Sequence, residues 1–330
     1  MPWARAFVTG GSGFVGAALV HHLLDHGLEV AALSRSGRSD VDLAAAGAEP
    51  IRGDVLEPAA LSHAMAGCEL VFHVAALVRT CRRDPSAMVR VNVEGTRNVV
   101  AAAARAGVRR LVLTSSAATI GERAGEVGNE DTPHRGWYLT AYERTKHEAE
   151  EVALELGTSL GVEVVVVNPA SVQGPGRAEG SARLLLLAAR RRSVPVIQTW
   201  LGLVDVEDCA AGHRLAAEQG LPGRRYLLCG ASLSTPDLLA VLEEVLGRRL
   251  RSRGLPEAMT RVGGRLGDAW VALTGRGPIC AELARSAAHG HRYDGSRAVR
   301  ELGLAYTPLP TTLARTVAWF RDQGLLPEPR

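Results

Sequence analysis

Short apolar runs separated by helical patterns fill the first half of the chain. Runs that are apolar throughout predict strands at residues 5–9, 29–33, 49–51, 69–74, 110–114 and 162–167. Apolar residues at helical spacing predict helices between them, at residues 17–26, 58–66, 92–106 and 141–156. Because the strands do not alternate apolar with polar residues, we expect a parallel sheet covered by helices on both faces. This alternation of strands and helices predicts a doubly wound α/β fold.

The pattern is less regular beyond Pro169. It predicts strands at residues 203–206 and 225–229, a loop at 168–180, and helices at 255–273 and 311–323. We expect Gly263-Gly264 to interrupt the first of these helices. No repeat or low-complexity linker separates the two halves. We therefore predict a doubly wound domain at 1–170, to which segments near 203–230 and 293–305 return, and a smaller interwoven lobe formed mainly by 171–202 and 231–330.

Composition narrows the class of protein. The chain has 330 residues, of which 46% are hydrophobic and 22% charged, and these are ordinary globular values. A net charge of +3 is too small for a nucleic-acid-binding footprint. The apolar runs are far shorter than the roughly 20 residues that span a bilayer, and no apolar leader precedes the glycines that begin at Gly10. We expect a cytoplasmic protein without a membrane span.

The five cysteines lie far apart and form no Cys-x-x-Cys pair. This spacing favours reduced thiols over a disulfide framework. The five positions are Cys68, Cys81, Cys209, Cys229 and Cys280.

A glycine-rich turn stands between the first predicted strand and the first predicted helix. Gly10, Gly13 and Gly16 permit a tight turn, close approach of the backbone to a pyrophosphate, and close packing of helix on strand. The backbone N–H groups of the helix start, at Phe14 and Val15, can then bind the phosphates. A glycine triplet alone also occurs in ordinary loops, but here the strand, the helix and the N-terminal position agree with a dinucleotide site.

The residues after the second and third strands indicate which dinucleotide binds. An NAD site places an acid after the second strand, whereas an NADP site uses arginine for the 2′-phosphate. This chain has Ser34-Arg35 there, so NADP(H) is favoured and NAD(H) stays possible. Asp54-Val55 follows the third strand and can hold the adenine. The alternative is that Arg35 and Asp54 are simply solvated surface residues.

Candidate catalytic groups lie at the ends of later strands and on one helix. Tyr142 and Lys146 share a helix face, so the ammonium can lower the pKa of the phenol from its usual value of about 10. Alone, such a pair is usually a surface feature. However, Ser115-Ser116 ends one predicted strand, and the small residues Ala75-Ala76 end another, where they would let a nicotinamide ribose approach the backbone.

Together these motifs resemble the extended short-chain dehydrogenase/reductases of the NAD-dependent epimerase/dehydratase superfamily. The similarity covers nearly the whole chain, and the combination is specific although each motif alone is not. It is greatest to dihydroflavonol reductase-like, 3β-hydroxysteroid dehydrogenase-like and hopanoid-associated epimerase-like proteins. The motifs that carry it are the glycine turn, residues 71–76, 91–96, 114–117, 142–146, 168–176, 203–208 and 293–303.

The resemblance implies a role for each of these residues. Tyr142 would be the general acid/base, and Lys146 would bind the nicotinamide ribose. Ser116 would hold the substrate oxygen, with Ser115 as the fallback, and Pro169 would flank the nicotinamide. The domain at 1–170 would then be an NADP-binding Rossmann domain, and the smaller lobe would bind substrate. The predicted cofactor site comprises Gly10, Gly13, Phe14, Val15, Gly16, Arg35, Asp54, Val55, Ala75, Ala76, Lys146 and Pro169.

The predicted function is an NADP(H)-dependent carbonyl reductase or alcohol dehydrogenase acting on a small to medium, partly apolar substrate. The alternative is a nucleotide-sugar epimerase or dehydratase with tightly bound NAD(P). Members of that class commonly carry a diphosphate-binding arginine at the place of Leu201, which with Trp200 predicts apolar contact instead. Arg177 or Arg183 could substitute for it. A non-catalytic NADP(H) sensor is a third class, and the complete Ser-Tyr-Lys set argues against it.

Three further expectations concern other parts of the chain. His289-Gly-His291 could bind a metal, but no third ligand is recognisable nearby in the sequence, so no metal is predicted. His73 is expected to be a hydrogen-bonded core residue, and Asn92 to brace the strand ends. The resemblance also implies a possible homodimer formed through the helices that contain Asn98 and Tyr142.

Overall fold

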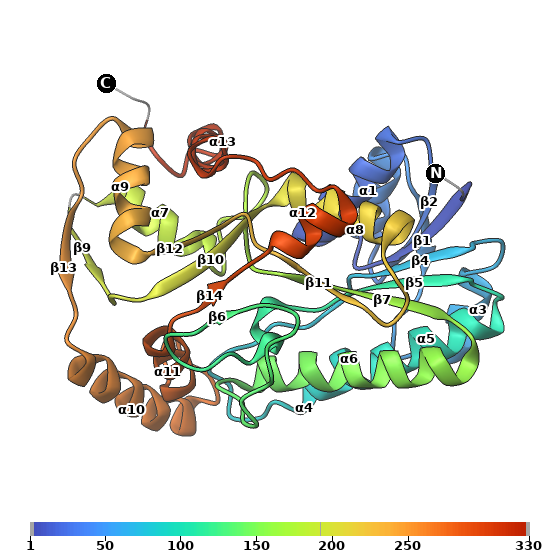
Figure 1. Cartoon of the computed structure of the whole chain (residues 1–330), viewed down its shortest axis with the longest axis horizontal. Coiled ribbons are helices and arrows are strands. Elements are labelled where there is room, and N and C mark those ends of the chain that lie inside the picture. Colours follow the sequence, from blue (N-terminus) through green and yellow to red (C-terminus); the bar gives the residue numbers. More distant parts are fainter. Residues whose placement is uncertain (1–2, 192, 328–330) are drawn as a thin grey trace.

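A seven-stranded parallel sheet forms the centre of the molecule (Figure 1). The structure is a computed structural model that describes residues 3–191 and 193–327. The strand order is β11-β7-β5-β4-β1-β2-β3, so the predicted doubly wound fold is confirmed. The strands predicted in the first half are all present, with ends that differ by at most two residues. They are β1 Arg5–Thr9, β2 Glu29–Ser34, β3 Glu49–Arg52, β4 Leu70–His73, β5 Arg110–Thr114 and β7 Glu163–Pro169, joined by β11 Arg225–Leu228.

Helices cover both faces of this sheet because its strands are apolar on both sides. Phe7 and Val8 follow each other in β1 and pack into opposite cores. One face carries α1 Phe14–Asp25, α2 Gly37–Ala45, α8 Val206–Gln219 and α12 Ser296–Leu302. The other carries α3 Pro58–Ala64, α5 Gly95–Arg105 and α6 Ala141–Leu160. The helix predicted at 92–106 is longer, because α4 Ser86–Met88 and a π-helical turn at Val89–Glu94 lead directly into α5.

Three small sheets form much of the second half. β8 Ser171–Gln173 and β12 Ala231–Ser234 flank β10 Trp200–Asp205. β9 Ser193–Val196 pairs with β13 Arg251–Gly254, and β6 Val127–Gly128 with β14 Arg292–Tyr293. The segment predicted as a loop at 168–180 therefore contains a strand. The strand predicted at 203–206 is present as part of β10, but it pairs with β8 and β12 and not with the central sheet.

The helices of the second half are α7 Ala182–Arg190, α9 Thr235–Leu246, α10 Glu257–Thr274, α11 Ala281–His289 and α13 Leu309–Asp322. The expected break at Gly263-Gly264 was wrong, because α10 runs through both glycines. A Cβ on Gly264 would lie 3.0 Å from the Cα of Ala281 in α11. This glycine is therefore needed for close helix packing and does not end the helix.

The expectation that all five cysteines are reduced was also wrong. Cys81, in the loop after β4, forms a disulfide with Cys280 at the start of α11, 199 residues later. Their Cα atoms are 5.3 Å apart, which is ordinary for a disulfide. Cys68, Cys209 and Cys229 are buried free thiols. No helix in the described part of the chain is both long and apolar enough to cross a membrane.

Candidate active site

The glycine turn after β1 leaves room that side chains would fill. Gly10 has a φ of +75°, and a Cβ there would lie 2.7 Å from the backbone nitrogen of Ala75. A Cβ on Gly16 would lie 2.0 Å from the carbonyl oxygen of Gly10. The N-cap of α1 is Gly13, which has no side chain to satisfy the first N–H groups of that helix. The first N–H groups of α1 are therefore free of a side-chain cap and could hold phosphate oxygens.

The carboxyl end of β2 carries no acid. Ser34 is buried and donates its hydroxyl to the carbonyl of Ser36, 3.1 Å away. The side chain of Arg35 is 73% exposed, and its Nη1 lies 3.9 Å from Oδ2 of Asp54. Oδ1 of Asp54 accepts from the backbone N–H of Leu56 at 3.0 Å. The second and third strands thus place a solvated cation beside one carboxylate, at the edge where ligands bind in such sheets.

Val55 faces inward at the same edge. Its side chain is buried against Gly95, where a Cβ would lie 2.9 Å from Cγ2 of Val55. Its carbonyl accepts a hydrogen bond from Nδ2 of Asn98 at 3.0 Å. Val55 therefore anchors the loop after β3 to α5 while Asp54 remains at the surface.

Tyr142 and Lys146 lie in the first two turns of α6. The hydroxyl of Thr140 caps this helix by accepting from the N–H of Glu143 at 3.0 Å. Lys146 is buried and donates from Nζ to the carbonyl of Thr114 at 2.6 Å. Burial lowers the pKa of Lys146 to about 8. Burial raises the pKa of Tyr142, and a hydrogen bond with Ser116 opposes that rise.

The two serines after β5 have different surroundings. Ser115 is buried, and its hydroxyl has no hydrogen-bond partner among the described residues. Ser116 is half-buried and caps the short 3₁₀ helix Ala117–Ile120. It is close enough to Tyr142 to work to lower the pKa of that phenol. The geometry therefore brings Ser116, Tyr142 and Lys146 together at one edge of the sheet.

Asn92 joins the loop after β4 to the helix that carries Tyr142. Its side chain accepts from the N–H of Leu77 at 2.7 Å and donates to the carbonyl of Leu77 at 3.0 Å. It also donates to Oγ1 of Thr145 at 3.0 Å. These contacts show the bracing position that the sequence predicted.

His73 is the hydrogen-bonded core histidine that the sequence predicted. Its Nδ1 lies 2.7 Å from the hydroxyl of Thr9, and its Nε2 lies 3.0 Å from the hydroxyl of Thr96. Burial, and to a lesser degree the charge of Lys146, lower the pKa of His73 to about 3. A neutral imidazole therefore ties β1 and β4 to α5.

A buried network behind Lys146 was not foreseen. Oε1 of Glu150 accepts from Oγ1 of Thr119 and from Nδ2 of Asn168, each at 2.6 Å. Its other oxygen lies 3.1 Å from Nε of Arg225. Glu150 stands four residues after Lys146, and this spacing was the one signal that could have identified it. The network fixes α6 against β7 and β11.

Arg177 lies beside the glycine turn. The sequence predicts that it could bind a diphosphate in place of the arginine that is missing at Leu201. Its guanidinium carbon is 4.6 Å from the ring centre of Phe14. Nη2 donates to Ser181 Oγ at 3.1 Å, whereas Nε is buried without a partner among the described residues. The positive charge of Arg177 also works to lower the pKa of Tyr142. A cation is thus present close to the candidate catalytic phenol.

His289 and His291 do have a neighbouring carboxylate, which the sequence did not reveal. Nδ1 of His291 lies 2.7 Å from Oε1 of Glu122, and Nε2 of His289 lies 3.1 Å from the carbonyl oxygen of Glu122. The three potential ligand atoms lie within 4.8 Å of one another. In the structure their hydrogen bonds join the end of α11 and the residue before β14 to the loop before β6.

The surroundings of Trp200 differ in part from the expected apolar contact. The guanidinium carbon of Arg292 lies 4.1 Å from the ring centre of Trp200. Leu201 packs against the apolar cluster of the second half. The contact of Arg292 with Trp200 could not be predicted from the sequence, because the two residues lie on separate strands, β14 and β10.

The family model for the NAD dependent epimerase/dehydratase family matches residues 6–229. This match includes the glycine turn, the serines after β5, and the helix with Tyr142 and Lys146. It therefore covers the candidate cofactor and catalytic residues from Gly10 to Arg177, but not His289, His291 or Arg292.

Two curated relatives match nearly the full chain. The chain is 35% identical to a "Putative dihydroflavonol 4-reductase" of Synechocystis, with coverage of 96% of this chain and 95% of the relative. It is 33% identical to "Sterol demethylase protein B" of Methylococcus capsulatus, with coverage of 97% and 99%. Among solved structures, that of a protein named gox2253 is 30% identical, with a TM-score of 0.85 and coverage of 98% and 100%.

Proposed function

The chain belongs to the NAD-dependent epimerase/dehydratase family, and on that premise we propose that it is an NADP(H)-dependent carbonyl reductase or alcohol dehydrogenase. NAD(P)-dependent oxidoreductase chemistry follows from the reductases among its relatives. The observation that carries the proposal is that Ser116 comes just after β5, while the buried ammonium of Lys146, one helical turn after Tyr142, donates to the carbonyl of Thr114 at the end of the same strand. The proposed substrate is small to medium in size and partly apolar.

Each group has a distinct part in the proposed reaction. When bound, a nicotinamide cofactor would supply the hydride chemistry at the substrate carbon. Tyr142 moves the proton to or from the substrate oxygen, which Ser116 holds by a hydrogen bond. The proposed part of the Lys146 ammonium is to favour the phenolate form of Tyr142 once the cofactor is bound. Burial raises the pKa of that phenol, and Ser116 and the charge of Arg177 oppose the rise. The carbonyl of Thr114 keeps Lys146 in place.

NADP(H) is the proposed cofactor. The turn from Gly10 to Gly16 has the open backbone that a pyrophosphate needs. The exposed guanidinium of Arg35 directly after β2 would bind the 2′-phosphate, and β2 itself ends in Ser34 and not in an acid. Arg38 follows in the first turn of α2 and is also exposed.

Relatives support a substrate with an apolar body. One is named for a dihydroflavonol and another for a sterol, and both names denote compounds with a skeleton of several carbon-rich rings. We propose that the lobe of residues 171–202 and 231–330 contacts this part of the substrate. Apolar groups such as Leu201 would provide the contact.

The proposal is tested by following NADPH oxidation with a panel of ketones and aldehydes. The panel includes aryl ketones, 3-oxo acids and cyclic ketones of ring-fused compounds. We expect steady net oxidation of NADPH with at least one of these classes, and slower oxidation of NADH. A panel without any turnover, tested with protein shown to bind NADPH, would count against a carbonyl reductase.

The second candidate is a nucleotide-sugar epimerase or dehydratase, in which the cofactor returns to its starting state. Arg177 near Tyr142 and Arg292 against Trp200 are the cations that favour it. Calorimetric titration of the NADP-loaded protein with UDP, TDP and GDP separates the two. We expect no micromolar binding, and micromolar binding of any of them would place this second candidate first.

A further inference from the structure

Helix α10 lies at the outside of the second half of the molecule, beside α11 (Figure 1). It packs on its neighbours through small residues. A Cβ on Gly264 would lie 3.0 Å from Cβ of Ala284, and one on Gly267 would lie 2.3 Å from the carbonyl oxygen of Ile279. Val271 is the one large side chain of α10 that is buried among its described residues. The packed face of this helix is therefore made mainly of glycine.

The large apolar side chains of α10 face the solvent. Their spacing of three or four residues places them on one face of the helix, which we call the α10 stripe. A surface helix ordinarily turns such a stripe toward the core. Single exposed apolar residues need no explanation, but a contiguous patch marks an interaction site. The stripe consists of Met259, Val262, Leu266, Trp270 and Leu273, which are 60%, 55%, 68%, 59% and 85% exposed.

Basic residues border the α10 stripe. Arg265 stands on the exposed side of the same helix, and Arg251 and Arg253 are exposed on β13, the strand before it. The acid nearest the middle of the helix is Asp268, and its Oδ1 accepts from the N–H of Ala281 at 2.9 Å. This face of the molecule therefore combines apolar side chains with positive charge.

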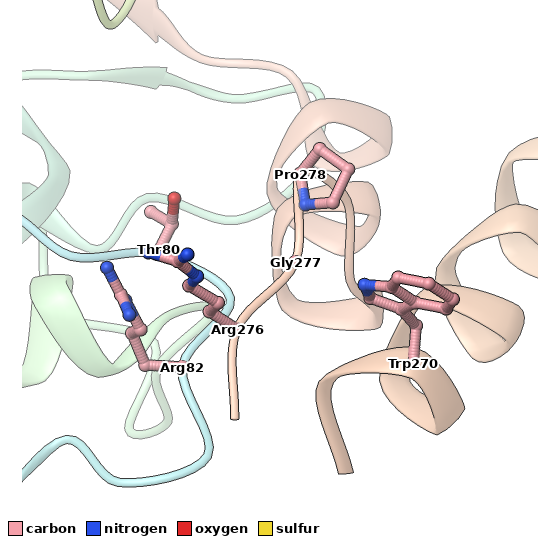
Figure 2. A pocket seen from close by; sticks show the side chains of 6 residues that line it. All are labelled: Thr80, Arg82, Trp270, Arg276, Gly277 and Pro278. Carbon is pink, nitrogen blue, oxygen red and sulfur yellow. The ribbon is translucent and has the colours of Figure 1, made fainter. Parts of the chain in front are cut away.

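A hollow of about 330 Å³ adjoins the C-terminal part of the stripe (Figure 2). Arg82 and Arg276 lie on one side of it and Trp270 on the other. The two arginines face each other across an antiparallel bridge, and neither guanidinium has a partner among the residues that the structure describes. Two unpaired like charges side by side favour an anion between them. The hollow is lined by Thr80, Arg82, Trp270, Arg276, Gly277 and Pro278.

We propose that α10 rests in the surface of an anionic phospholipid bilayer. The α10 stripe would insert among the acyl chains, and Arg82 and Arg276 would bind a lipid phosphate in the hollow. An apolar helix face with Trp and Leu and an arginine border is typical of interfacial helices. A second copy of this chain is a poorer occupant, because a symmetric contact would bring the same arginines of both copies together.

This contact would place the candidate active site near the bilayer. Glu282 of α11, the helix that packs on α10, accepts from the N–H of Ala141, which directly precedes Tyr142. The Cys81–Cys280 disulfide also holds α11 to the loop after β4. An apolar substrate could therefore pass from the lipid to the catalytic helix over a short path. The membrane contact itself does not depend on which reaction the site catalyses.

The test is sedimentation of the full chain with vesicles of phosphatidylcholine alone or mixed with phosphatidylglycerol. We expect at least about tenfold tighter binding to the anionic vesicles. The double variant Leu266→Glu/Leu273→Glu should lose binding at least about tenfold, because it places charge in the stripe. Leu184→Glu, a change at a similarly exposed leucine of α7, should leave binding unchanged. The double variant Arg82→Ser/Arg276→Ser should weaken binding to the anionic vesicles and leave binding to phosphatidylcholine vesicles unchanged.

Thermal unfolding and NADPH binding verify that each variant is folded. The proposal would be overturned if the unmutated protein did not bind anionic vesicles. It would also be overturned if the folded stripe variant bound these vesicles as tightly as the unmutated protein. Light scattering completes the test. If Leu266→Glu/Leu273→Glu converts a dimer to a monomer and no vesicle binding is seen, the stripe belongs to a second copy instead.

Discussion

Tyr142 carries the proton transfer in the proposed reaction, and its hydroxyl can be removed without its ring. Tyr142→Phe should lower turnover at least about a hundredfold, the contribution usual for a general acid/base. Cofactor binding should stay within about twofold, because the ring still fills its place. The measurements are the steady-state rate and NADPH fluorescence titration. Tyr138→Phe, a matched change at a tyrosine that hydrogen-bonds His147, should keep its activity. A Tyr142→Phe rate above about a tenth of normal would contradict the assigned role.

Arg35 sets the proposed preference for NADP(H). Loss of one charge-assisted hydrogen bond costs about 1.5–3 kcal/mol, so Arg35→Ala should weaken NADP(H) binding about tenfold or more. NAD(H) lacks the 2′-phosphate, and its binding should barely change. Calorimetric titration with both cofactors measures this, with Arg105→Ala on the exposed surface of α5 as the control. Equal affinity of the unmutated protein for NADP(H) and NAD(H) would be incompatible with the proposal.

Lys146 should make the free energy of unfolding of the cofactor-free protein depend on pH. Its pKa is about 8 in the folded state against 10.5 for an ordinary lysine, because burial disfavours the ammonium. Between these two values the unfolded chain binds more protons, so this group raises the free energy of unfolding as pH rises. The slope approaches about 1.4 kcal/mol per pH unit inside that window. Urea unfolding at about pH 8 and about pH 10 measures the change in the free energy of unfolding between these pH values. This increase should be larger in the unmutated protein than in Lys146→Met. Parallel pH curves for the two proteins would refute it.

At the residue scale, sequence reasoning worked where one motif identifies one side chain. The spacing of Tyr142 and Lys146 predicted their shared position on a helix, and the structure shows both in the first two turns of α6. Residues whose role depends on a distant partner were not recognisable. Glu122 meets His291 across 169 residues, and Arg292 meets Trp200 from another strand. Neither pairing leaves a local pattern in the chain.

At the element scale, the parallel strands were predictable because each is apolar along its whole length. The hydrophobic pattern of the sequence did not predict all the short strands of the second half. β8 has three residues, and it forms because β10 lies beside it rather than through any pattern of its own. Gly263-Gly264 misled the prediction because glycine lowers helix propensity locally, while the fold needs its small size for the contact with α11.

The Cys81–Cys280 disulfide links the loop after β4 to α11 and so constrains two elements far apart in sequence. Such a crosslink typically stabilises a protein by about 2–4 kcal/mol, mainly by restricting the unfolded chain. Reduction with dithiothreitol should therefore lower the free energy of unfolding of the unmutated protein by that amount in urea titrations. The Cys81→Ser/Cys280→Ser variant should be insensitive to the reductant. If reduction affected both proteins equally, the disulfide would not be responsible.

At the scale of the whole molecule, the carboxyl edge of the sheet and the second half converge on the catalytic helix. The glycine turn, Arg35 and Ser116 come from the sheet edge, whereas Glu282 reaches the start of α6 from α11. The sequence predicted that these two halves are interwoven. It did not predict how they are joined, because the disulfide and the contact of Glu282 bring together residues more than a hundred positions apart.

The most direct test of the central claim is to follow the hydride itself. NADPH deuterated at the transferable position of its nicotinamide ring is supplied with a ketone or aldehyde that the protein turns over, and the products are analysed by mass spectrometry. We predict one deuterium at the carbinol carbon of each alcohol formed, and at least about a hundredfold less of this product in the same time with Tyr142→Phe. An alcohol without deuterium, or conversion of a nucleotide sugar while the label stays on the cofactor, would contradict the proposed carbonyl reductase.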